Sequence, residues 1–147
     1  QVGARMASWG LAPERLEILP PAAQPADHLA LYSRVDIALD PFPYNGTTTT
    51  FEALWMGVPV VTLRGARHAA RVGASILTHM GRSEWIATDV AGYQQIALGL
   101  ATDLGTLAKQ RGSLRSALRA STLCDAAGFA RKLEATYREL LQSQGFG

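Results

Sequence analysis

Short apolar runs alternate with longer amphipathic stretches along this chain. Runs rich in Val, Ile and Leu, each bounded by Pro, Gly or Asp, are typical of β-strands. Three of them are clear and a fourth, the last, is weaker: residues 15–19, 35–40, 58–63 and 85–87. The pattern therefore predicts a series of short strands confined to the first two thirds of the chain.

Helical spacing of apolar positions predicts helices between these strands. Asp27 is expected to cap a helix that runs to about residue 33. A second helix should fill residues 50–56, with Gly57 in the position after its last turn. A third is expected near residues 69–80, and helices without strands from about residue 91 to residue 142.

Strands that alternate with helices at short linker spacing indicate βαβ units. The sequence therefore predicts the α/β class, with a parallel sheet flanked by helices on both faces. At 147 residues the chain has the length of one domain, residues 1–147, whose helical C-terminal portion covers about residues 91–142. Because the chain opens on Gln1 inside a helical pattern, we expect it to be a piece of a longer protein.

The composition excludes several classes of protein. With 48% hydrophobic and 18% charged residues the chain is typical of a soluble globular domain, and a net charge of +2 without a basic run gives no sign of a nucleic-acid partner. The longest nearly apolar run, residues 53–63, is shorter than the ~18 residues of a membrane span. The single cysteine, Cys124, excludes an internal disulfide and agrees with a cytoplasmic location; we expect its thiol to be buried.

Candidate chemistry is concentrated in the stretch DPFPYNGTTTTFEALWMGVPVV, residues 40–61. Its four threonines fall where a strand ends at Asp40 and a helix begins near Thr50, which is the edge of an open α/β sheet where ligands bind. A helix N-terminus with hydroxyls beside it can hold a phosphate without any Lys or Arg. Asn45 and Gly46 supply a tight turn, and Gly46 allows the backbone to approach a ligand closely.

A structural explanation of the same residues remains open. Thr49 and Glu52 have the spacing of a capping box, in which each side chain satisfies a backbone amide at the start of the helix. Capping boxes are common, although a cap does not require four threonines. Phe51, Leu54 and Trp55 lie at helical spacing and are expected in the core.

The segment VDIALDPFPYNGTTTTFEALWMGVPVVTL, followed by ARVGASIL and YREL, resembles the C-terminal catalytic half of the protein O-GlcNAc transferases, especially their bacterial relatives with tetratricopeptide repeats. The resemblance extends from about residue 14 to about residue 141. It implies a GT-B glycosyltransferase, in which two Rossmann-like domains face a cleft. This chain would then be the C-terminal, UDP-sugar-binding domain, and helical repeats upstream would bind the acceptor polypeptide.

The resemblance also implies roles for residues of the threonine stretch. Thr48 and Thr49 match threonines that hydrogen-bond the diphosphate of the donor. Glu52 matches a carboxylate that accepts hydrogen bonds from the ribose hydroxyls. The turn next to the diphosphate and the sugar is matched by Asn45, Gly46 and Thr47.

Two further matches lie upstream of this stretch. His28 aligns with a histidine that stacks on the uracil, and Ala23 with a residue whose main chain reads the uracil edge. Animal members of the family have an arginine three positions after that histidine, whereas this chain has Leu31.

The implied function is to hold the UDP-sugar in an inverting transfer of N-acetylglucosamine to Ser or Thr of proteins. No metal and no cofactor is implied. The lysine that neutralises the departing diphosphate in the family lies upstream of Gln1, so the catalytic residue is unknown and the chain alone is expected to be inactive. Two alternatives remain: a non-catalytic nucleotide-binding module, and a protein-interaction module whose threonines only cap a helix.

Overall fold

A three-stranded parallel sheet lies at the centre of the chain, of which a computed structural model describes residues 1–144. Its strands are β1 (Ala38–Leu39), β2 (Val60–Leu63) and β3 (Ile86–Ala87), in the order β1-β2-β3. Both strand pairs are parallel. This arrangement confirms the predicted α/β class, with strands shorter than the apolar runs that contain them.

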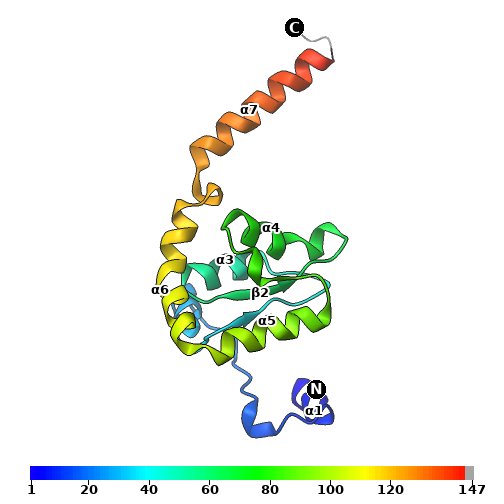
Figure 1. The fold of residues 1–147 in the computed structure, drawn as a ribbon, viewed down its shortest axis with the longest axis vertical. Coiled ribbons are helices and arrows are strands. Elements are labelled where there is room, and N and C mark those ends of the chain that lie inside the picture. The colour runs from blue at the N-terminus through cyan, green and yellow to red at the C-terminus, as the bar shows by residue number, and fades with distance from the viewer. Residues whose placement is uncertain (145–147) are drawn as a thin grey trace.

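Helices cover both faces of the sheet. Figure 1 shows α3 (Thr48–Trp55) and α4 (Val72–His79) over one face and α5 (Val90–Thr102) against the other, while α6 (Leu104–Ala120) runs beside them at the edge of the domain. The remaining helices are α1 (Val2–Ser8), α2 (Pro25–Leu31) and α7 (Ala126–Ser143), and single 3-10 turns cover Pro13–Arg15, Tyr32–Arg34, His68–Ala70, Ser83–Trp85 and Thr122–Cys124.

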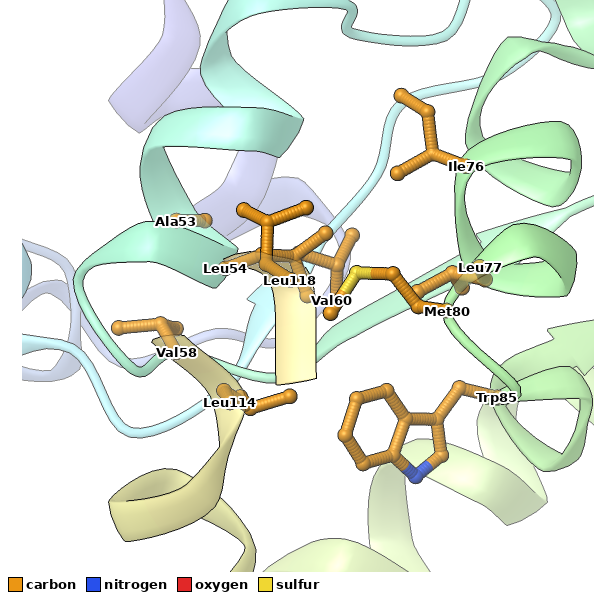
Figure 2. Close-up of a cluster of buried hydrophobic side chains, with 10 residues drawn as sticks. All are labelled: Ala53, Leu54, Val58, Val60, Ile76, Leu77, Met80, Trp85, Leu114 and Leu118. Atoms are coloured by element: carbon orange, nitrogen blue, oxygen red, sulfur yellow. The ribbon is translucent and has the colours of Figure 1, made fainter. Parts of the chain in front are cut away.

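The core lies between β2, α3, α4 and α6. Leu54 of α3 and Leu77 of α4 are fully buried, and Leu114 and Leu118 of α6 meet them from the edge of the domain. Burying a leucine side chain contributes roughly 1.5–3 kcal/mol, so α6 is a structural part of the sheet domain although it follows the last strand. Figure 2 shows the whole cluster: Ala53, Leu54, Val58, Val60, Ile76, Leu77, Met80, Trp85, Leu114 and Leu118.

Gly57 ends α3 as the sequence predicts. Its φ is +79°, a left-handed conformation that favours glycine, and the amide of Val58 donates back to the carbonyl of Ala53 at 2.8 Å. A Cβ at Gly57 would lie 2.9 Å from the carbonyl oxygen of Arg111 on α6. The tight reversal therefore allows β2 to start directly under α3 and α6 to pack beside it.

The predicted strand at residues 15–19 is wrong. Pro13–Arg15 forms a 3-10 turn, and Leu16 is extended, with φ −116° and ψ 116°. No strand within residues 1–144 pairs with this segment, and Ile18 is 63% exposed. Because a strand needs the hydrogen bonds of a neighbour, the local preference for extended backbone does not produce one here.

Three smaller predictions also need correction. Asp27 lies within the first turn of α2 and does not cap it, because Pro25 takes the first helical position and Gln24 the cap. Cys124 is exposed in the 3-10 turn after α6. Trp55, expected in the core, is 39% exposed and lies under the guanidinium of Arg115.

Two helices project from the sheet domain. α1 lies apart from it at one end and α7 extends away at the other (Figure 1). On α7 only Gly128 is buried, and one face of the helix exposes apolar side chains, namely Phe129, Leu133, Tyr137, Leu140 and Leu141. Within residues 1–144, no helix has the length and apolar character that a membrane span requires.

Candidate functional site

Asp40 anchors the turn that leads from β1 to α3. This carboxylate is only 3% exposed. Its Oδ1 accepts a hydrogen bond from the amide of Gly46 at 2.8 Å, and its Oδ2 accepts one from the hydroxyl of Thr62 on β2 at 2.6 Å. Its main-chain carbonyl accepts a third from the hydroxyl of Tyr93 at 3.0 Å. The turn is thus fixed to two strands and to α5 at the carboxyl edge of the sheet, where open α/β sheets bind ligands.

The surroundings of Asp40 change its protonation equilibrium. Burial raises the pKa of the Asp40 carboxyl, and the hydrogen bonds from Thr62 and Gly46 act in the opposite direction. Burial, and after it the charge of Asp40, raises the pKa of Tyr93 to about 12. Hydrogen bonds therefore favour the ionised form of Asp40, whereas the loss of hydration on burial disfavours it.

Gly46 is required by close packing within the turn. A Cβ at this position would lie 2.5 Å from Oγ1 of Thr49 and 3.0 Å from Oγ1 of Thr50. Its φ is not positive. The sequence interpretation, that Gly46 lets a ligand approach the backbone, is thus incomplete, because the chain's own threonine hydroxyls already occupy that space.

The four threonines divide into two groups. Thr50 is 3% exposed, and its hydroxyl donates to the carbonyl of Gly46 at 3.0 Å, so it serves the fold. Thr47, Thr48 and Thr49 are exposed at the start of α3. Among residues 1–144, no side chain caps the first amides of this helix. Hydroxyls and unpaired amides at one helix end form a suitable site for an anion.

The predicted capping box is wrong. α3 begins at Thr48, so Thr49 lies inside the helix and Glu52 lies beyond its first turn. Oε2 of Glu52 instead lies 3.0 Å from Nε2 of His28. The structure thus brings together the two residues that the resemblance assigns to the ribose and the base, although 24 positions separate them in the sequence.

Tyr32 contacts both His28 and Glu52, and sequence reasoning did not identify it as a site residue. Its hydroxyl lies 3.4 Å from Oε2 of Glu52 and 3.3 Å from the carbonyl oxygen of Thr49, and its ring meets the His28 ring edge to face at 5.6 Å. Burial, and after it the charge of Glu52, raises the pKa of Tyr32. The available signal was its position four residues after His28, because this spacing places two side chains on the same side of helical backbone; Tyr32 begins the 3-10 turn that directly follows α2.

The other expected site residues lie around this group. Thr48 precedes Thr49 in the first turn of α3, and Ala23 is exposed two residues before α2. Asn45 is 2% exposed; its amide donates to the carbonyl of Ala69 at 2.8 Å and its Nδ2 to that of Pro41 at 3.0 Å. Asn45 therefore holds the turn against the segment that follows β2.

A groove of about 620 Å³ begins beside this turn and runs along α4. Thr47 lines its end nearest the threonines, and the polar side chains beside it are Arg64, His68 and Arg71 from the segment between β2 and α4. Sequence reasoning missed these cations because Gly and Ala residues interrupt them, so that residues 64–71 form no continuous basic run. In the part of the chain that the structure describes, no three His, Cys, Asp or Glu side chains are grouped as metal ligands would be.

Comparisons with known proteins agree on one family. The family model described as "Glycosyl transferase family 41" matches residues 1–133. A protein of Petunia hybrida named "Probable UDP-N-acetylglucosamine--peptide N-acetylglucosaminyltransferase SPINDLY" is 45% identical over 89% of this chain. The UDP-N-acetylglucosamine--peptide N-acetylglucosaminyltransferase of Caenorhabditis elegans is 34% identical over 85% of it.

A solved structure gives the same result. A mutant of the Thermobaculum terrenum O-GlcNAc transferase superposes on 97% of this chain with a TM-score of 0.88 and 45% sequence identity. The chain covers 27% of that structure and 14% of the Petunia protein. It thus spans a small part of the relatives that it matches.

Proposed function

Because the chain belongs to glycosyl transferase family 41, we propose that it is the donor-binding part of an inverting glycosyltransferase. The donor is a UDP-sugar, UDP-N-acetylglucosamine in the first instance, and the acceptor is a Ser or Thr hydroxyl of a protein. The acceptor polypeptide is bound by parts of the whole protein outside this chain. No metal takes part in the proposed donor site.

One observation carries the proposal: the contact between His28 and Glu52 beside three exposed threonines. A carboxylate can accept hydrogen bonds from both hydroxyls of a ribose, and an imidazole ring beside it can stack on a base. The start of α3 lies about one turn, roughly 6 Å, from Glu52, so a nucleotide whose ribose contacts Glu52 can extend its phosphates toward this helix end. In this arrangement Ala23 meets the base edge, Thr48 and Thr49 bind the diphosphate, and Asn45, Gly46 and Thr47 flank the diphosphate and the sugar.

The chemical contribution of this chain is to stabilise the departing UDP. Negative charge grows on the diphosphate as the bond to the anomeric carbon breaks. Fixed donors that point at this charge lower the barrier, because they need no reorganisation during the reaction. The hydroxyls of Thr48 and Thr49 and the first amides of α3 are such donors, and the Asp40 network holds the turn before them in place.

The test is a calorimetric titration of the purified 147-residue chain with UDP, GDP and ADP. We expect UDP to bind and the purine nucleotides to bind at least tenfold more weakly. GDP belongs in the panel because Leu31 stands where animal members have an arginine near the nucleotide. Equal affinity for all three would remove the assignment of the donor as a UDP-sugar, and no binding of any would favour a protein-interaction module.

A further inference from the structure

The segment between β2 and α4 carries cations that nothing else in the structure uses. Arg64, Arg67 and Arg71 form no salt bridge and no side-chain hydrogen bond within residues 1–144. Arg111 and Arg115, by contrast, each donate to a main-chain carbonyl of a neighbouring element. The charge of this segment is therefore available to a ligand.

Few carboxylates lie near these cations, and the nearest one described, that of Asp40 against Gly73, is buried and already accepts hydrogen bonds from Gly46 and Thr62. The chain has no Asp or Glu between Glu52 and Glu84, an interval that holds the whole segment and α4. The groove along α4 accordingly has Arg64, His68 and Arg71 in its lining and no acidic side chain. Low surrounding negative charge and a concave surface strengthen the attraction for an anion.

The segment is fixed beside the threonine turn. The amide of Asn45 donates to the carbonyl of Ala69 at 2.8 Å, and the amide of Gly65 donates to the carbonyl of Ala70 at 2.8 Å. Arg71 follows Ala69 by two residues, just as Thr47 follows Asn45 by two, and both line the same groove. An arginine guanidinium is planar and presents several donors, so Arg71 is suited to bind a phosphate in the groove that Thr47 also lines.

We propose that Arg71, with Arg64 and His68, forms a second contact with the phosphates of the donor, in the groove that Thr47 lines at the start of α3. This inference rests on the proposed function, since it takes the donor diphosphate as the ligand of the groove. The threonines supply neutral donors, and the arginines supply the positive charge that a diphosphate needs. Arg71 is the principal residue, because it lies at the end of the segment nearest α4 and its guanidinium can bind a phosphate with two hydrogen bonds.

The experiment compares three probes: UDP, uridine and inorganic pyrophosphate. Each is titrated into the chain and into the variants Arg71→Gln and Arg64→Gln/Arg71→Gln, at low and at physiological salt. Arg67→Gln is the matched control, because it removes the same charge from the same segment but Arg67 does not line the groove. All three substituted arginines are exposed, so thermal melting should show the same fold in every variant.

We expect Arg71→Gln to weaken UDP binding about tenfold at low salt, the effect of one lost charge-assisted hydrogen bond. Uridine affinity should stay within twofold, pyrophosphate affinity should fall with that of UDP, and Arg67→Gln should match the unmodified chain. The proposal is overturned if the double variant binds UDP normally, or if uridine binding falls as much as UDP binding. If pyrophosphate binding depends on Arg71 but uridine does not bind at all, the result supports this anion site. The same result contradicts the proposed nucleotide site.

Discussion

Glu52 is the residue at which nucleotide binding and fold stability can be separated. Its carboxylate contacts His28 and Tyr32 and caps no helix. Glu52→Gln should therefore change the melting temperature little, while UDP affinity falls tenfold or more, because hydrogen bonds to a charged acceptor contribute about 1.5–3 kcal/mol each. Calorimetric titration and thermal melting measure the two effects, with Glu134→Gln on α7 as control. Unchanged affinity would leave the carboxylate without a part in binding.

Asp40 leads to a prediction about pH. Because burial raises its pKa in the folded state, the folded chain binds more protons than the unfolded chain just above the ordinary pKa of an aspartate. The stability that this group contributes therefore decreases as pH rises through that window. Asp40→Asn removes the ionisation and can keep both contacts, with its oxygen toward Gly46 and its nitrogen toward Thr62.

The melting temperature of Asp40→Asn, relative to that of the unmodified chain, should consequently rise between about pH 4 and about pH 7. Melting curves at several pH values in this range provide the measurement. A constant difference across the range would show that Asp40 ionises without cost in the folded chain.

Sequence reasoning at this scale predicted candidate ligand residues but not the contacts that hold them in place. Thr48, Thr49, His28 and Glu52 belong to motifs that a family resemblance can transfer. Tyr32 and the role of Asp40 depend on contacts between residues far apart in the chain, which no local pattern encodes. Tertiary position decided which threonine is a ligand candidate and which serves the fold.

At the scale of elements, the end of α3 allows a matched comparison of two glycines. Gly57 and Gly81 both have positive φ, but only Gly57 faces a backbone oxygen, that of Arg111 at 2.9 Å. Gly57→Ala adds a clash to the backbone strain and should cost roughly 2–3 kcal/mol, whereas Gly81→Ala should cost about 1 kcal/mol from strain alone. Chemical denaturation of the two variants gives both values. Equal losses would mean that α6 moves aside without cost.

The order of the elements was predictable because each βα unit has a local signature. Gly57 after α3 and the apolar run of β2 are such signals, and both predictions are confirmed. The run at residues 15–19 carried the same signal without forming a strand, because pairing depends on a neighbour that a local pattern does not reveal.

At the scale of the whole molecule, we predict that the isolated chain transfers no sugar. It covers 27% of the solved relative, so we expect the acceptor and further donor contacts to come from parts of the whole protein outside this chain. Neither transfer to a peptide nor hydrolysis of UDP-N-acetylglucosamine should exceed a blank without protein, even where UDP binds. Turnover by a preparation free of full-length enzyme would contradict this prediction.

The position of α6 in the core has a consequence for synthesis of the protein. Every residue proposed to contact the donor has been made once Arg71 leaves the peptidyl-transferase centre, but the core under α3 is closed only by Leu114 and Leu118. At roughly 5–20 residues per second, a ribosome needs on the order of several seconds to cover that interval. During this time Leu54 and Val60 of the nascent β1–α3–β2 unit lack the leucines of α6 that cover them in the folded domain, so this unit is a target for chaperones that bind apolar segments.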